Sequence, residues 1–103
     1  MHCFSEGPEF VQRLLDIGLH FSFAGNITYP KSDLIRESAS LIPADKLLIE
    51  TDAPFLAPQP MRGKKNQSAY IVHTLDVVAS SRNVTANDIR RQIFDNSIKL
   101  FNL

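Results

Sequence analysis

A short apolar run that leads directly into acidic residues is the feature that most restricts the fold of this chain. Residues 46–52 read Lys-Leu-Leu-Ile-Glu-Thr-Asp and are followed by Ala-Pro. Apolar runs of this length are typical of strands buried in a parallel sheet. Side chains at i and i+2 share one face of a strand, so Leu48, Glu50 and Asp52 point the same way. The segment therefore predicts a buried parallel strand with two carboxylates at its C-terminal end.

The segments that precede this strand alternate between helical and extended patterns. Apolar residues at helical spacing predict a helix over 8–17, which begins at Pro8 and stops at Gly18. Alternating large and small residues then predict a strand over 19–25. A helix, a strand, a second helix and the acidic strand therefore follow one another along the chain.

Three further helices have recognisable N-terminal signals. Ser32 is the expected N-cap of a helix that stops at Pro43, and Ser68 is the expected N-cap of a second helix. Thr85 begins a third, with Asp88 in a capping-box-like position. Between the acidic strand and Ser68, three prolines and a glycine predict an irregular loop, and a loop this long in a compact domain is usually functional.

Strands that alternate with helices indicate an α/β fold with a parallel sheet. Only two strands are evident, or three if residues 1–3 continue a strand. The 103 residues fit one small domain, whereas a complete (β/α)₈ barrel typically takes about 250 residues. The edges of so small a sheet need covering strands. The sequence therefore resembles part of a larger structure.

The composition excludes several other classes of protein. Eleven basic residues balance eleven acidic ones, and 44% of the residues are hydrophobic, which is ordinary for a globular domain. No apolar run approaches the roughly 20 residues of a membrane-spanning helix, and residues 1–8 lack the pattern of a secretory signal. The single cysteine, Cys3, has no partner for an internal disulfide. We expect a cytoplasmic protein without membrane association, or a nuclear one in a eukaryote.

The residues that could bind a metal lie where strands end. In βα folds, ligands bind beyond the C-terminal ends of the strands, which here means near His2, Gly25 and Asp52. A buried carboxylate is costly unless it is paired or bound to a metal, and imidazole is a common metal ligand. The alternatives are that Asp52 caps the next segment or pairs with a lysine, and that His2 is merely exposed.

A basic loop follows the acidic strand. Arg62, Gly63 and Lys64 combine a bidentate phosphate binder with a glycine that allows close backbone approach. A solvated loop without function has the same composition, so both interpretations stay open. His20 and His73 are expected to be structural or surface residues. Cys3 has no evident activating base and is not expected to be a nucleophile.

Taken together, these segments resemble the C-terminal part of the TatD-type metal-dependent deoxyribonucleases. The resemblance covers nearly all of the chain, in the family's order and spacing, and its blocks are His2-Cys3-Phe4-Ser5, Phe21-Ser22-Phe23-Ala24-Gly25 with Thr28, Leu47 to Pro58, Arg62 to Asn66 with Tyr70, and Asn96 to Phe101. It implies a partial TIM (β/α) barrel. Residues 1–103 would form roughly its last three βα units, as a single incomplete domain.

The resemblance also implies the chemistry of the site. His2 and Asp52 would be metal ligands, for one or two divalent ions of magnesium, manganese or zinc in the complete enzyme. Asp52, with Glu50 in a less defined role, would be catalytic, and Arg62, Gly63 and Lys64 would contact substrate. The implied reaction is hydrolysis of DNA phosphodiester bonds, in single strands or at ends, by a metal-activated water.

Several parts of the family pattern are absent from this chain. It lacks the paired His-x-His of the first strand and the metal-binding Glu and His of the middle strands, Glu6 replaces a usual glycine, and Lys99 replaces a usual arginine. The chain alone is therefore expected to lack the full metal site. The expected partners are DNA and either the N-terminal part of the barrel or a second copy of the chain. The alternative function is a non-catalytic remnant or interaction module that binds another chain through its open sheet edge.

Overall fold

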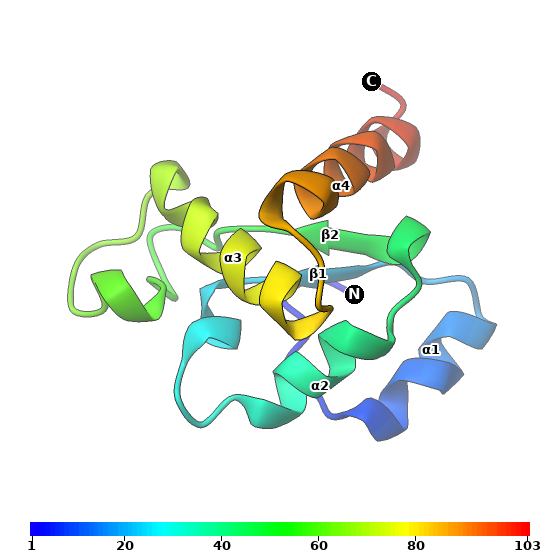
Figure 1. Ribbon diagram of the computed structural model, residues 1–103, viewed down its shortest axis with the longest axis horizontal. Coiled ribbons are helices and arrows are strands. Elements are labelled where there is room, and N and C mark those ends of the chain that lie inside the picture. The colour runs from blue at the N-terminus through cyan, green and yellow to red at the C-terminus, as the bar shows by residue number, and fades with distance from the viewer.

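The computed structural model describes residues 1–103 and contains a two-stranded parallel sheet flanked by helices (Figure 1). Strand β1 spans Phe21–Phe23 and β2 spans Leu47–Ile49, with Phe21 opposite Leu47. The parallel α/β arrangement is confirmed. Both strands are shorter than the predicted 19–25 and 46–52, because turns begin within a few residues of each end and the regular ladder stops there.

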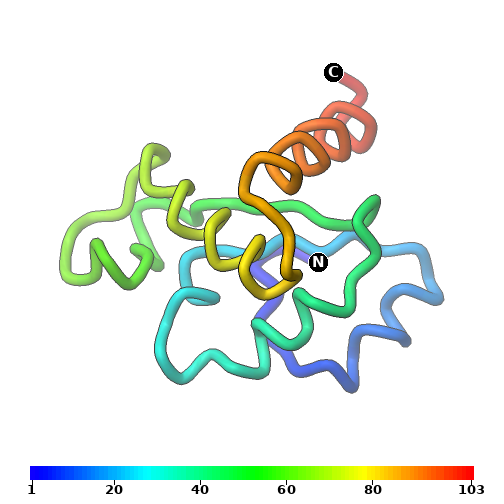
Figure 2. Tube along the Cα trace, viewed as in Figure 1, coloured from blue at the N-terminus to red at the C-terminus, as the bar shows by residue number.

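The first four residues lie alongside β1, where a third strand was expected (Figure 2). The Ser22 N–H donates to the Met1 carbonyl at 2.9 Å, and the Ser22 carbonyl accepts from the Phe4 N–H at 2.8 Å. A regular parallel ladder would place one residue between these two partners, but here both His2 and Cys3 intervene. Cys3 takes a left-handed φ of 47°. The segment therefore forms a bulge instead of a regular strand.

Four α-helices follow the predicted order, and their bounds are Val11–Asp16 for α1, Asp33–Leu41 for α2, Ile71–Ser81 for α3 and Ala86–Phe101 for α4. The predicted helix over 8–17 is corrected in two respects. Its first turn, Pro8–Phe10, is a 3₁₀ turn, and the α-helix ends at Asp16. Gly18, with φ of 83°, provides the left-handed residue that terminates it.

The predicted caps have mixed outcomes. The Thr85 hydroxyl accepts a hydrogen bond from the Asp88 N–H at 3.1 Å, so this cap is confirmed. The Ser32 side chain makes no cap hydrogen bond, because its backbone is not in the extended conformation that N-caps adopt. Ser68 is also wrong as a cap, since it lies inside the 3₁₀ turn Ser68–Tyr70 that precedes α3.

The hydrophobic core lies between the sheet and helices α2, α3 and α4, with α3 crossing in front of the strands in Figure 1. Its centre is aromatic: the Phe4 ring meets the rings of Phe21 and Phe23 edge-on, with centroids 5.1 and 6.0 Å apart. Such pairs add to the free energy gained from burying the rings. The sheet and the N-terminal segment are thereby held against one another, which fixes the C-terminal ends of both strands.

The opposite face of the sheet carries Ser22 and Leu48 and is only partly covered. It opens into a cleft of about 330 Å³, which Leu100 and Phe101 of α4 also line. His20 lies in this cleft, on the side of β1 away from the aromatic core. No helix of the chain has the length and apolar character needed to cross a membrane.

Candidate functional site

Three side chains that could hold a metal meet at the C-terminal ends of the strands. One ligand atom from each of His2, Glu50 and Asp52 lies within 4.8 Å of the other two. The imidazole sits between the carboxylates, with Nδ1 at 2.6 Å from Glu50 Oε1 and Nε2 at 3.8 Å from Asp52 Oδ1. The structure thus brings together an imidazole and two carboxylates from segments almost 50 residues apart in sequence.

The spacing and burial of this cluster fit a divalent cation. Nitrogen and oxygen ligands lie about 2.0–2.2 Å from zinc. Two ligands of one ion therefore cannot be much more than about 4 Å apart. The 3.8 Å between His2 Nε2 and Asp52 Oδ1 meets this condition. Glu50 Oε1 is buried and accepts no well-aligned hydrogen bond despite the nearby imidazole. A buried carboxylate is costly unless it is paired or bound to a metal, so a cation would stabilise this oxygen beyond its contact with the imidazole.

The bulge at the N-terminus places His2 in this cluster. Because Cys3 adopts a left-handed conformation, its N–H turns away from β1 and donates to Glu50 Oε2 at 2.8 Å. The same bulge leaves the His2 side chain 76% exposed beside Glu50, which is only 16% exposed. Glu50 therefore contacts the N-terminal segment through both of its oxygens.

Asp52 reaches the cluster through an unusual backbone conformation. The Glu50 N–H still donates to the Phe23 carbonyl, which extends the sheet by one bond beyond β2. Asp52 then has a φ of 58°, in the left-handed region that aspartate tolerates better than most residues. The prediction that Asp52 shares a face with Glu50 as part of a continuous strand is therefore wrong in its geometry, although the two carboxylates do converge.

A buried asparagine fixes the loop that follows Asp52. Asn66 is 5% exposed, and its Nδ2 donates to the carbonyls of Thr51 and Phe55, both at 2.7 Å. The Asn66 N–H also donates to the Pro54 carbonyl at 3.1 Å. These bonds join the two ends of the loop, so the irregular segment between them has a defined shape.

The same loop crosses closely over the end of β1. A Cβ atom on Gly25 would lie 2.1 Å from the Leu56 carbonyl oxygen, so only glycine fits there. The neighbouring Thr28 hydroxyl accepts from the Gln59 N–H at 2.7 Å. The 3₁₀ turn Gly25–Thr28 is therefore the support on which the loop rests.

The predicted substrate residues lie on the exposed part of this loop. Arg62, Gly63 and Lys64 are all exposed, and none of them belongs to the His2, Glu50 and Asp52 cluster. The Arg62 guanidinium carbon lies 4.2 Å from the centroid of the Tyr29 ring. Gly63 has a φ of 92°, which suits glycine.

The remaining predicted residues have no chemical role in this arrangement. Burial raises the pKa of the Cys3 thiol, and the nearby carboxylates of Glu50 and Asp52 raise it further, so the reactive thiolate is disfavoured. Burial, and to a smaller extent Lys46, lowers the pKa of His20. His73 lies on α3, outside the cluster.

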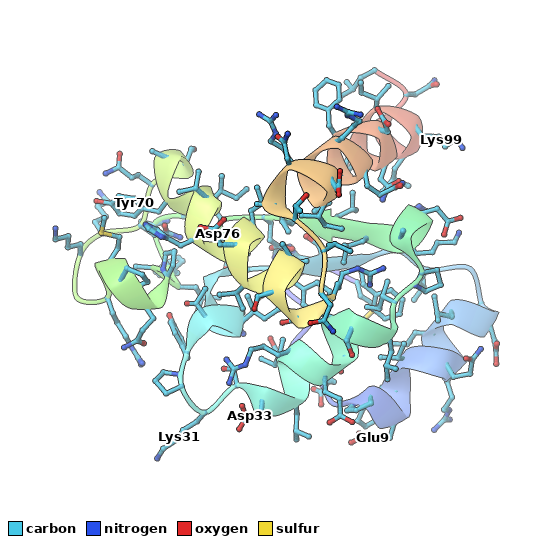
Figure 3. All side chains as sticks on the ribbon, viewed as in Figure 1. Glu9, Lys31, Asp33, Tyr70, Asp76 and Lys99 are labelled. Carbon is cyan, nitrogen blue, oxygen red and sulfur yellow. The ribbon has the colours of Figure 1, made fainter.

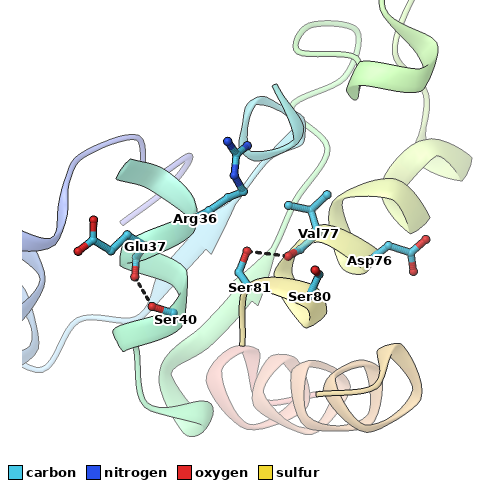
Figure 4. A pocket seen from close by; sticks show the side chains of 7 residues that line it. All are labelled: Arg36, Glu37, Ser40, Asp76, Val77, Ser80 and Ser81. Carbon is cyan, nitrogen blue, oxygen red and sulfur yellow. Dashed lines mark hydrogen bonds between the residues drawn. The ribbon is translucent and has the colours of Figure 1, made fainter. Parts of the chain in front are cut away.

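A second hollow lies between α2 and α3 (Figure 4). Its lining is mostly polar, and two of its polar side chains are already engaged within the chain. Ser81 donates to the Val77 carbonyl at 2.8 Å, and Arg36 donates to the Ile27 and Tyr29 carbonyls. It holds no histidine or cysteine, and we assign no function to it.

Comparison with known proteins identifies the family. The family model for TatD related DNase matches residues 1–102. The chain belongs to this family. It is 38% identical to the metal-dependent hydrolase YcfH of Escherichia coli over 103 residues, and 36% identical over 108 aligned positions to a protein of Pantoea ananatis named 3'-5' ssDNA/RNA exonuclease TatD. The first comparison spans 100% of this chain but 39% of the relative, so the chain covers about two fifths of that length.

Solved structures of TatD proteins share the fold. The crystal structure of YJJV, a TatD homologue from Escherichia coli, superimposes with a TM-score of 0.91 over 100% of this chain and 40% of the other, at 28% identity. A TatD-family hydrolase from Entamoeba histolytica gives a TM-score of 0.81 at 17% identity, which shows likeness of fold alone. The resemblance found in the sequence motifs is therefore confirmed as TatD family membership.

Sequence reasoning missed the residues that support the site. Asn66 stands in a polar stretch with no signal of its burial, and Tyr29 stands in a loop with no signal of its contact with Arg62. The Cys3 bulge has no sequence signal either. Only the glycine after β1 was an indication, because a glycine at a strand end often permits close backbone approach.

Proposed function

We propose that this chain is the C-terminal portion, roughly the last three βα units, of a TatD-type barrel hydrolase that cleaves DNA phosphodiester bonds. The observation that carries the proposal is the meeting of His2, Glu50 and Asp52 at the C-terminal end of β2, with Glu50 Oε1 buried 2.6 Å from His2 Nδ1. The names of the relatives support metal dependence, and the Pantoea protein supports a nucleic acid substrate.

In this proposal His2, Glu50 and Asp52 hold a divalent cation. When bound, such a cation supplies a water of lowered pKa and positive charge beside the phosphate. Asp52 is 34% exposed, so its carboxylate can reach both the cation and solvent. It orients the attacking water and accepts its proton. Arg62 binds a substrate phosphate and stabilises the negative charge that develops there.

Magnesium, manganese and zinc all suit a site of one imidazole and two carboxylates. Three protein ligands leave coordination positions open, which is typical of catalytic rather than structural sites. The middle strands of complete family members supply further ligands, by the motif resemblance described above. The full site therefore needs the rest of the barrel, provided as another segment or another chain. The interaction-module alternative is not favoured, because it gives no role to the clustered carboxylates.

The test removes the carboxylate of Asp52, which in this proposal both binds the cation and accepts the proton of the attacking water. Binding of Mn²⁺ is measured by calorimetry for the wild-type chain and for Asp52→Ala. Loss of groups that only orient a metal ligand weakens affinity by about 10- to 100-fold, so loss of a direct ligand is expected to weaken Mn²⁺ binding at least tenfold. Cleavage of labelled single-stranded DNA, where the wild type shows it, is expected to disappear in this variant.

Asp76→Ala is the matched control. Asp76 is an exposed carboxylate on α3 (Figure 3), and it does not belong to the cluster. Its removal changes the net charge of the protein by the same amount without touching the site. Equal Mn²⁺ affinity in the two variants would contradict the proposed metal site.

A further inference from the structure

We propose that Tyr29 is a positioning residue for phosphate recognition, because its ring holds the Arg62 guanidinium ready to bind a phosphate of single-stranded DNA. The inference rests on the proposed function, which makes nucleic acid the substrate. It starts from the distance of 4.2 Å between the guanidinium carbon and the ring centroid. At that distance a guanidinium is attracted to the negative face of an aromatic ring.

Arg62 differs from Arg36 and Arg82, whose guanidinium groups are engaged within the chain. The Arg36 guanidinium donates to three backbone carbonyls and pairs with Asp33. Arg82 donates to the carbonyls of Ala39 and Ile42, and burial lowers its pKa. The ring of Tyr29 is the contact that the structure records for the Arg62 side chain. Its N–H groups therefore remain available for a ligand.

The ring is held in place from two sides. The Tyr29 hydroxyl donates to the Ala57 carbonyl at 3.0 Å, which ties the ring to the loop after β2. The Tyr29 carbonyl accepts from Arg36 Nη1 at 2.6 Å, which ties the backbone to α2. A ring held at both its hydroxyl and its backbone is a rigid surface for a long, exposed side chain.

The backbone of Arg62 is hydrogen-bonded, through Gln59, to the residue that precedes Tyr29. Its N–H donates to the Gln59 carbonyl at 3.2 Å, and the Gln59 N–H donates to the Thr28 hydroxyl at 2.7 Å. Thr28 and Tyr29 are adjacent in sequence. Both ends of the Arg62 side chain are therefore fixed relative to one short segment at the end of β1.

This arrangement suits recognition of phosphate by arginine. A guanidinium can lie with its flat face on an aromatic ring while the N–H groups at its edge bind phosphate oxygens in a bidentate manner. Holding it in advance reduces the side-chain entropy lost on binding. Lys64 and Lys65 are exposed nearby in sequence, and they contribute charge without this fixed geometry.

The experiment measures binding of fluorescently labelled single-stranded oligo-dT to the 103-residue chain by anisotropy, in EDTA. Tyr29→Leu removes the ring, and we expect about threefold weaker binding. Tyr29→Phe keeps the ring and is expected to retain most of the affinity. In the Arg62→Ala background, Tyr29→Leu should have no further effect, because the ring acts through the guanidinium.

Lys64→Ala is the control for general loss of charge or loop structure. Its effect should add to that of Tyr29→Leu, because the cation that lies over the ring is Arg62. Equal effects of Tyr29→Leu with and without Arg62 would overturn the inference, as would wild-type protein that binds no oligo-dT. EDTA removes divalent cations, so binding does not depend on hydrolysis. A chain that passes this test but whose Asp52→Ala variant binds Mn²⁺ as tightly as its Asp76→Ala variant would contradict the proposed function alone.

Discussion

The loop after β2 and helix α4 are ordered in opposite ways. The loop has little regular structure beyond the 3₁₀ turn Gln59–Met61, yet Asn66, Thr28 and Tyr29 fix it through side-chain hydrogen bonds. Helix α4 is regular over 16 residues, yet its Phe94 is 62% exposed. In this chain, the loop that carries the proposed phosphate-binding residue Arg62 is held by polar side-chain anchors and not by regular secondary structure.

The difference follows from what each region must do. Ordering one residue costs about 1–2 kcal/mol of backbone entropy, and the loop has no helical hydrogen bonds to offset that cost. Side-chain donors such as Asn66 supply the missing bonds. Helix α4 satisfies its own backbone, so it needs only one buried face. The substitutions below therefore test the anchoring of the loop first and the exposed face of α4 last.

Among changes that affect the loop, the largest expected effect on stability comes from Gly25→Ala. The added Cβ would lie 2.1 Å from the Leu56 carbonyl oxygen, a backbone atom that cannot move without displacing the loop. We expect the free energy of unfolding to fall by about 3 kcal/mol, at the upper end of overpacking effects. Urea unfolding followed by circular dichroism measures this change.

Gly63→Ala is the matched control for this substitution. Gly63 has a φ of 92° but no atom within 4 Å of an added Cβ. Its replacement should cost only the backbone strain of the left-handed conformation, about 1 kcal/mol. If the free energy of unfolding falls equally in Gly25→Ala and Gly63→Ala, the close approach of the loop to Gly25 does not contribute to stability.

A smaller effect is expected from Asn66→Ala. This variant removes the donors to the Thr51 and Phe55 carbonyls. Unsatisfied buried groups of this kind cost about 1–3 kcal/mol, and we expect a loss of about 2 kcal/mol. Because the bonds close the loop locally, trypsin should also cleave after Arg62 more than tenfold faster under native conditions.

Asn87→Ala is the corresponding control in α4. Asn87 is exposed and accepts a hydrogen bond from Arg90 on the helix surface. Exposed pairs of this kind contribute only a few tenths of a kcal/mol, and the loop is untouched. Unchanged trypsin cleavage in Asn66→Ala would mean that the loop is held by other contacts.

The convergence of the site residues could be predicted from the sequence, but its exact geometry could not. The C-terminal ends of parallel strands meet at one edge of a sheet, which is enough to expect His2 near Asp52. The left-handed conformations of Cys3 and Asp52 depend on bonds to distant segments. No local pattern encodes them, because each becomes favourable only after the strands have paired.

The anchoring of the loop was equally outside the reach of local patterns. Prolines and a glycine predict that residues 52–67 are irregular, but they do not say which polar side chain will be buried to hold them. Asn66 and Gln67 are neighbouring amides of similar chemistry, and only Asn66 is buried. Which of the two amides is buried depends on the position of the Thr51 carbonyl, and the sheet sets that position.

The smallest effect is expected on the exposed face of α4. Phe94 is 62% exposed while the adjacent Ile93 is 7% exposed and belongs to the core. Phe94→Ser should change the free energy of unfolding by less than about 0.5 kcal/mol, whereas Ile93→Ala should cost about 3 kcal/mol because it leaves a cavity. Urea unfolding of both variants measures the contrast. A large loss in Phe94→Ser would mean that this face is covered in solution, and that α4, like the loop, is ordered by contacts on more than one side.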